Sequence, residues 1–450
     1  MRRLPICSEP YVPSKNNRER GAFYDTFPFE YPTGGVGDYR ESCLSIRTEG
    51  GHAGSMLSYV SHEIMAGKPG LAGLPATFGS DKECETLKLV CEDVYVGMQV
   101  ELLYTAFSDV DVITRSVRVV NKGKEPFYLT KVYSACLDMD NRDYDMITLH
   151  GSWARERHIQ RKPLGYGIQR TSSFRGESSH QEHPFLALVD RHTTQEQGEV
   201  YAMNFVYSGN FCAQAEVSQF DFVRMSMGIH QENFCWKLSP GEDFQAPEVV
   251  MVYTDQGLDA MTGTFRSLYR KHLLQGKYKD KKRPILINNW EATYFDFDTK
   301  KLLAIAREAS ALGIEMLVMD DGWFGNRSFD GCALGDWFVN EEKIDGGLAH
   351  LVEEVNKLGM KFGIWFEPEM ISPDSALYRE HPDWAIAIPG RPGTQSRQQY
   401  VLDLSRKEVV DCIYGMMSAV LRSANIEYVK WDMNRQLTDI GSAALPPDRQ

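Results

Sequence analysis

The stretch Glu315-Met316-Leu317-Val318-Met319-Asp320-Asp321 is a short apolar run that ends in two carboxylates. Such a continuous apolar run predicts a strand that is buried on both faces. Similar runs recur along the second part of the chain and alternate with helical segments, which indicates a parallel sheet. The expected strands cover residues 284–290, 315–321, 361–367 and 426–432, and the expected helices cover residues 299–312, 348–358 and 407–423.

The ends of these strands distinguish between two kinds of parallel sheet. No glycine-rich phosphate loop follows the first strand, so a dinucleotide-binding fold is disfavoured. Each strand ends instead in polar, acidic or Trp residues, as in a (β/α)8 barrel whose active site lies at the carboxyl ends of its strands. Four strands make half of such a barrel. Residues 400–405 are either a further strand or an extended connection that ends in a helix cap at Ser405.

The first part of the chain has a different pattern. Apolar and polar residues alternate with period two in residues 87–90, 112–120 and 127–133, and turn signals such as Asn121-Lys122-Gly123 separate the runs. This pattern is typical of an antiparallel sandwich. We therefore expect a multidomain β plus α/β protein. Its parts are a sandwich over residues 1–257, a helical linker over 258–283 and a partial barrel over 284–450.

Composition restricts the class of partner. The 450 residues carry a net charge of −13 and 11% aromatic residues. This charge argues against nucleic acid and anionic membranes and favours a neutral small molecule. The 9 Cys contain no C-x-x-C pair, and neither a signal peptide nor a membrane span is expected. We predict a cytoplasmic protein with free thiols and without a metal, since His180 and His183 lack a third metal ligand nearby.

Three sets of residues could carry chemistry. Lys430 and Asp432 lie two positions apart, so they share one face of a strand, and the cation could keep a nucleophilic carboxylate ionised. A structural ion pair is the alternative.

Asp320 and Asp321 could accept hydrogen bonds from sugar hydroxyls, bind a metal or cap a turn. Glu367 and Glu369 could orient other groups or lie on a solvated rim. The remaining candidates are Trp290, Trp323, Trp337 and Trp365, which suggest a stacking surface for a sugar ring, although some of them must be packing.

Nine motifs in a fixed order make the chain resemble the bacterial α-galactosidases, or melibiases, of glycoside hydrolase family 36. They are residues 29–32 (FEYP), 37–40 (GDYR), 73–77 (GLPAT), 151–157 (GSWARER), 207–211 (YSGNF), 320–325 (DDGWFG), 334–337 (LGDW), 365–369 (WFEPE) and 430–435 (KWDMNR). The resemblance implies an N-terminal antiparallel β-supersandwich, a catalytic (β/α)8 barrel, a retaining reaction without a cofactor and a tetrameric assembly.

The resemblance also implies roles for particular residues. Asp432 would be the nucleophile, and Asp320 and Asp321 would hold galactose hydroxyls. The other residues implied to bind substrate are Lys430, Arg397, Asn434, Trp290, Trp365 and Trp153. The family's acid/base lies on a later barrel strand after a Ser-Gly-Gly run, and this sequence has no such run.

We therefore expect part of a longer retaining α-galactosidase for melibiose and raffinose-type sugars. We expect the isolated chain to have little or no activity. The alternatives are a galactoside-binding chain without catalysis, an α-N-acetylgalactosaminidase and a galactosyltransferase of the same family.

Overall fold

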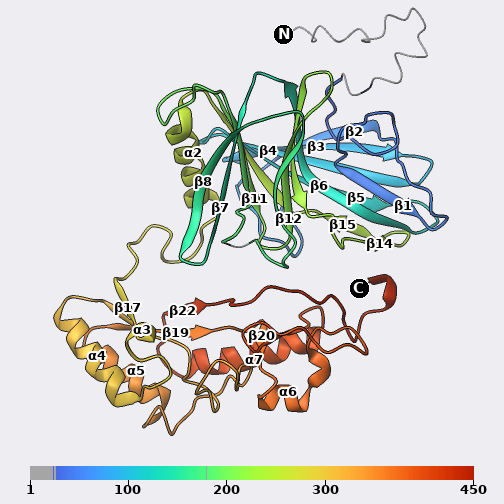
Figure 1. The fold of residues 1–450 in the computed structure, drawn as a ribbon. Coiled ribbons are helices and arrows are strands. Elements are labelled where there is room, and N and C mark those ends of the chain that lie inside the picture. Colours follow the sequence, from blue (N-terminus) through green and yellow to red (C-terminus); the bar gives the residue numbers. More distant parts are fainter. Residues whose placement is uncertain (1–23, 25–26, 179, 450) are drawn as a thin grey trace, which may run out of the picture. The chain divides into compact units, whose positions relative to one another are not determined.

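The computed structural model describes residue 24 and residues 27–178 and 180–449. They divide into two compact units, one that runs to Lys279 and one from Asp280 to Asp448. Figure 1 shows strands throughout the first unit and helices beside strands in the second. No helix among the described residues is long and apolar enough to cross a membrane.

Two antiparallel sheets make up the first unit. The larger has the order β2-β3-β4-β5-β16-β11-β10-β7-β8, with β15 beside β5, and the smaller has the order β1-β6-β13-β12-β9, with β14 beside β6. The larger sheet contains β2 (Ser58–Ala66), β3 (Cys84–Asp93), β4 (Met98–Phe107), β5 (Val112–Asn121), β7 (Asp145–Ser152), β8 (Arg155–Pro163), β10 (Phe185–Val189), β11 (Val200–Val206), β15 (Asp243–Gln245) and β16 (Glu248–Thr254). The smaller contains β1 (Leu44–Thr48), β6 (Phe127–Asp140), β9 (Gly167–Ser173), β12 (Phe211–Val217), β13 (Phe222–Ile229) and β14 (Trp236–Leu238).

Period-two patterning explains how these sheets pack. Leu102 of β4 pairs with Val117 of β5, and both side chains are buried. They share one core with Phe127 and Leu129 of β6 in the other sheet. The turn after β5 is fixed by Asn121, whose side chain donates to two backbone carbonyls and accepts the N–H of Gly123 at 2.8 Å. The predicted sandwich is confirmed.

The expected linker over residues 258–283 contains the helix α2 (Gly257–His272). This helix belongs to the first unit, because its apolar side packs on the larger sheet. Met261, Phe265 and Leu268 are buried there with Val250 of β16.

The second unit contains a four-stranded parallel sheet with the order β17-β18-β19-β22. Its strands are β17 (Leu286–Asn288), β18 (Met316–Met319), β19 (Lys361–Phe366) and β22 (Tyr428–Trp431). Its helices are α3 (Trp290–Thr293), α4 (Thr299–Ala311), α5 (Gly347–Lys357), α6 (Ala376–Glu380) and α7 (Lys407–Arg422), with short 3₁₀ turns at Pro382–Trp384 and Pro447–Arg449. Every residue of β18 is buried, as its apolar sequence predicts. The half-barrel expectation is confirmed.

The ambiguous residues 400–405 lie outside the parallel sheet. The short strand β21 (Tyr400–Val401) pairs antiparallel with β20 (Met370–Ile371). Ser405 does not cap the following helix: α7 begins after Arg406, and the Ser405 hydroxyl donates to the Asp403 carboxylate instead. These residues therefore form a connection beside the sheet.

Candidate functional site

The carboxyl ends of β17, β18, β19 and β22 carry polar side chains next to one another. Because these strands are parallel neighbours, their carboxyl ends meet at one edge of the sheet. Asn288 ends the first strand, Asp320 follows the second, Glu367 follows the third and Asp432 follows the fourth. These four residues, which are spread over nearly 150 positions of the sequence, thus lie at one edge of the sheet.

Asp320 is a buried carboxylate that accepts from three donors. Its Oδ2 accepts from Lys430 Nζ at 2.8 Å and from the side-chain amide of Asn288. Its Oδ1 accepts the N–H of Asp321 at 2.9 Å, and only 2% of the residue is exposed. This arrangement corrects one expectation: Lys430 forms its ion pair with Asp320, not with Asp432. The lysine reaches across β19 to a carboxylate two strands away.

Asp321 is held by a cation that the sequence analysis did not single out. Arg327 Nε and Nη2 bind the two carboxylate oxygens of Asp321 at 2.9 and 2.7 Å. Arg327 Nη1 also donates to the backbone carbonyls of Asp330 and Cys332, so its guanidinium is fixed from two sides. Burial raises the pKa of Asp321, and the nearby guanidinium opposes that rise. A fork of this kind sets the direction of both carboxylate oxygens.

Asp432 is surrounded by neutral N–H donors. Its Oδ2 accepts from Trp365 Nε1 and from Asn434 Nδ2, both at 3.0 Å. Its Oδ1 accepts the backbone N–H of Met433 at 3.1 Å, and its own N–H donates to Phe366 O on the neighbouring strand. The residue is only partly buried, unlike Asp320 and Asp321. The carboxylate is therefore oriented by three donors and remains accessible.

The four Trp residues fall into two groups. Trp323, Trp337 and Trp365 are at most 2% exposed and pack against one another with Phe324. The Trp323 indole donates to the Trp365 carbonyl at 2.9 Å, so Trp323 helps to fix the backbone of Trp365. Trp323, Trp337 and Trp365 are core residues and do not form a stacking surface, and only the Trp365 indole N–H reaches Asp432. Trp290 is half-buried at the end of β17, where it contacts Tyr294 and Phe295.

Glu367 and Glu369 are not on a solvated rim. Glu367 is 1% exposed and accepts the backbone N–H of Asn434 at 2.6 Å. Burial raises the pKa of Glu367 to about 7, and the carboxylates of Asp432 and Asp321 add to the rise. Glu369 accepts from the Trp431 indole at 2.7 Å, and burial raises its pKa as well.

Two expected site residues lie away from this cluster of contacts. Arg397 has a left-handed backbone (φ 53°), and its guanidinium binds Asp330 Oδ1 at 3.3 Å. The Asp330 carbonyl accepts from Arg327, so Arg397 is connected to Asp321 through two intermediates. Trp153 is 82% exposed between β7 and β8 in the first unit. Its part in binding stays a prediction.

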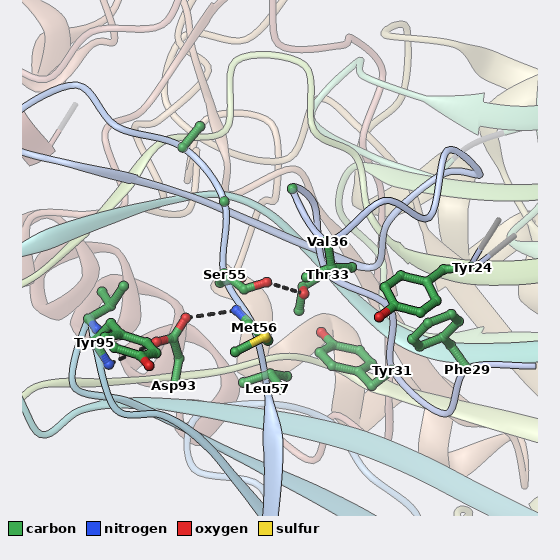
Figure 2. A pocket seen from close by; sticks show the side chains of 14 residues that line it. Tyr24, Phe29, Tyr31, Thr33, Val36, Ser55, Met56, Leu57, Asp93 and Tyr95 are labelled. Atoms are coloured by element: carbon green, nitrogen blue, oxygen red, sulfur yellow. Dashed lines mark hydrogen bonds between the residues drawn. The ribbon is translucent and has the colours of Figure 1, made fainter. Parts of the chain in front are cut away.

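The first unit contains a cavity of about 780 Å³, which is a weaker candidate for the functional site than the edge of the parallel sheet (Figure 2). Tyr24, Phe29 and Tyr31 line it on one side. Its carboxylate, Asp93, is already engaged by the backbone N–H groups of Met56 and Tyr95 at 2.8 and 3.0 Å. Its polar groups thus serve the surrounding loops.

Within the described part of the chain, no three His, Cys, Asp or Glu side chains lie together as possible metal ligands. His180 and His183 line a separate cavity in the first unit with Arg157. Desolvation lowers the pKa of His183, and Arg157 adds to this effect. The eight cysteines among the described residues are free thiols, and Cys7 lies outside those residues.

Comparisons with known families place this combination of fold and site in one class, that of the glycoside hydrolases. The model of the glycosyl hydrolase family 36 N-terminal domain matches residues 6–239, and the melibiase model matches residues 243–450. The chain therefore belongs to glycoside hydrolase family 36.

Named relatives agree with this family. The chain is 51% identical over its whole length to the α-galactosidase AgaA of Geobacillus stearothermophilus and covers 62% of that protein. It is 48% identical to the α-galactosidase Mel36A of Lactobacillus acidophilus over 95% of the chain, which covers 58% of that protein. The crystal structure of AgaA matches the whole chain with a TM-score of 0.97, and the chain covers 63% of it. The chain thus spans about 60% of the length of these relatives.

Proposed function

We propose that this chain carries the sugar-binding and nucleophilic part of a retaining α-galactosidase. The observation that supports this most directly is the setting of Asp432. Three N–H donors orient its carboxylate, and it stays partly exposed beside two buried carboxylates that are each paired with a cation. A covalent nucleophile requires a fixed and reachable oxygen, and the three donors and the partial exposure of Asp432 support this role.

In the proposed reaction, a carboxylate oxygen of Asp432 attacks the anomeric carbon of an α-galactoside. The bond to the leaving oxygen breaks as the ester bond forms, and a β-galactosyl ester of Asp432 results. A second carboxylic acid protonates the leaving oxygen. The same group then removes a proton from water, which attacks the ester and releases galactose with its α-configuration. Trp365 and Asn434 would keep the nucleophile directed at the sugar throughout.

Asp320 and Asp321 would recognise the sugar. Both carboxylates form ion pairs with cations that hold them in place, so their oxygens are oriented as acceptors for sugar hydroxyls. Lys430, Asn434, Arg397 and Asn288 would add donors, while Trp290, Trp365 and Trp153 would bound the pocket. Raffinose, stachyose and 1-deoxygalactonojirimycin are the compounds bound in crystal structures of AgaA variants. We infer terminal α-galactosyl groups of this kind as the substrate class.

The second carboxylic acid limits what this chain can do. Retaining glycosidases place their two carboxyl groups about 5–5.5 Å apart. In the family, by resemblance, this acid lies on a later strand than any described here. We therefore expect the 450-residue chain to be glycosylated by reagents with a good leaving group, and to turn over natural galactosides slowly.

Two further features belong to this proposal. The free thiols are consistent with a reducing compartment, so we infer a cytoplasmic enzyme. The resemblance to tetrameric members implies a homotetramer for the whole enzyme.

The alternatives differ in one measurable respect each. A binding protein without catalysis would bind galactose but would not form an ester at Asp432. An α-N-acetylgalactosaminidase would prefer an acetamido group at the sugar's 2-position, and a galactosyltransferase would pass galactose to a sugar acceptor faster than to water.

The test uses α-galactosyl fluoride, because fluoride leaves without a proton from the enzyme. We expect intact-mass spectrometry to show one added galactosyl group, and peptide mapping to place it on Asp432. Asp432→Ala should not be labelled, and α-glucosyl fluoride should label the wild-type chain much more slowly. No label on a folded wild-type chain, or the same label in Asp432→Ala, would refute the proposed role.

A further inference from the structure

Glu367 is a buried carboxyl group that the proposed reaction does not use. It directly follows β19, the strand beside β22, and it is 1% exposed. Placing a carboxyl group in such a position is costly unless its contacts compensate. One of its carboxylate oxygens contacts Asn434, whose side chain binds Asp432, and the other faces Gln399.

One oxygen of Glu367 fixes the chain just beyond Asp432. Its Oε1 accepts the backbone N–H of Asn434 at 2.6 Å. The side chain of the same Asn434 donates from Nδ2 to Asp432 Oδ2 at 3.0 Å. Glu367 thus holds the backbone of the residue whose amide orients the nucleophile. Its position after β19 is itself fixed, because the preceding Phe366 accepts the N–H of Asp432 at 2.8 Å.

The other oxygen of Glu367 faces a second buried amide. Gln399 Nε2 lies 3.3 Å from Glu367 Oε2, and Gln399 is fully buried. Within the described residues, Gln399 Oε1 has no hydrogen-bond partner, so Glu367 is the polar contact of this side chain. The Gln399 carbonyl accepts from Arg435 Nη1 at 2.7 Å, which joins the segment to the residue after Asn434. Glu367 is therefore held from both sides.

We propose that Glu367 is a positioning residue for the nucleophile, and that it acts through the backbone of Asn434. The proposal rests on the proposed role of Asp432. The proposal predicts different effects of removing Glu367 on the rate of attack and on sugar affinity. The rate of attack by Asp432 should fall, because a loosened Asn434 no longer aims the carboxylate. Sugar affinity should change less than the rate, because Asn434 would supply one sugar contact, whereas the pair of Asp320 and Lys430 joins β18 and β22 without Glu367.

The experiment measures the rate of labelling of the full chain by α-galactosyl fluoride at several reagent concentrations. Glu367→Ala should lower the limiting rate by about 10- to 100-fold, as misplacement of a reacting group does. The reagent concentration for half-maximal rate should stay within a few-fold of the wild-type value. Glu367→Gln should restore most of the rate, because its Oε1 can still accept the Asn434 N–H. Glu354→Ala on the exposed face of α5 is the control and should label like the wild type.

Three results would overturn the proposal: full labelling of Glu367→Ala, an equal loss of affinity and rate, or no rescue by Glu367→Gln. Absence of label on the wild-type chain would refute the role of Asp432 instead. A second measurement then still tests Glu367. In ¹H–¹⁵N spectra, Glu367→Ala should shift the side-chain amide signals of Asn434 as strongly as Asp432→Ala does. Unchanged Asn434 signals in a folded Glu367→Ala chain would refute the positioning contact.

Discussion

The carboxylates after β18 and the carboxylate after β22 are stabilised in different ways. Asp320 and Asp321 are buried, and each forms an ion pair, with Lys430 and Arg327 respectively. Asp432 is partly exposed, and its carboxylate accepts from N–H groups of Trp365, Met433 and Asn434. The carboxylates of Asp320 and Asp321 are thus paired with cations, whereas that of Asp432 is oriented by N–H dipoles.

This difference matches two different tasks. A carboxylate that recognises hydroxyl groups has to remain a charged acceptor in a buried place, and a fixed cation stabilises it there. A nucleophile has to share its electrons with carbon, and a close cation would reduce that tendency. Glu367 is a third case, since it is buried beside both groups without a cation and its pKa rises to about 7.

Breaking the pair between Arg327 and Asp321 should have the largest effect on stability. In Arg327→Met, the buried Asp321 carboxylate loses both of its guanidinium bonds and remains an uncompensated charge. Removing one partner of a buried pair typically costs about 3–5 kcal/mol. Urea unfolding followed by Trp fluorescence should show this loss, and galactose binding should weaken with it.

The control for this prediction is an exposed pair in the same unit, Arg379 with Asp374, whose side chains are 62% and 71% exposed. Arg379→Met should cost less than about 1 kcal/mol. The double variant Arg327→Met with Asp321→Asn should recover stability without recovering galactose binding. Equal stability of Arg327→Met and Arg379→Met would contradict our view of the buried pair.

The pH dependence of stability should distinguish Glu367 from the paired carboxylates. Its pKa of about 7 in the folded chain exceeds the ordinary value of 4.5, so the folded state holds a proton that the unfolded state releases. The free energy of unfolding therefore falls as pH rises from 4.5 to about 7, and the loss is complete above that range. A shift of this size corresponds to roughly 3 kcal/mol.

Glu367→Gln has no proton to lose and should remove this loss. Its stability relative to the wild type should rise with pH by roughly the same 3 kcal/mol, as measured by urea unfolding at several pH values. Glu354→Gln should leave the wild-type profile above about pH 5 unchanged, because its hydrogen bond with Lys357 lowers the pKa of Glu354. A pH-independent difference between Glu367→Gln and the wild type would show that folding does not raise the pKa of Glu367.

The sequence allowed the parallel strands and their acidic ends to be predicted, because these depend on local patterns. The apolar run at residues 315–321 became β18 (Met316–Met319), and Asp320 and Asp321 follow it as expected. The sandwich followed equally from period-two alternation. The sequence did not show that α2 covers a sheet and is not part of a linker, since amphipathic helices have the same pattern in both places.

Lateral partners could not be predicted in this way. Spacing places Lys430 and Asp432 on one face of a strand, but a lysine is long enough to reach Asp320 beyond the neighbouring strand. Arg327 lies in an irregular loop, so no periodic pattern pointed to its contact with Asp321. Trp323 lies shortly after β18, as a residue of a sugar platform would, yet it packs against Trp337 and both are buried.

The smallest expected effect concerns the neutral donors of Asp432. Trp365→Phe keeps an aromatic ring against Phe324, with which Trp365 stacks at 6.1 Å, but removes the indole N–H that Asp432 accepts. Loss of one such bond costs about 1 kcal/mol, so labelling by α-galactosyl fluoride should slow by roughly 5- to 10-fold.

Trp337→Phe is the matched control. It removes the same volume from the same aromatic cluster, and Trp337 Nε1 has no hydrogen-bond partner among the described residues. The two variants should lose similar stability, but only Trp365→Phe should slow the labelling of Asp432. Equal labelling rates would mean that the backbone of Met433 and the amide of Asn434 suffice to orient the nucleophile.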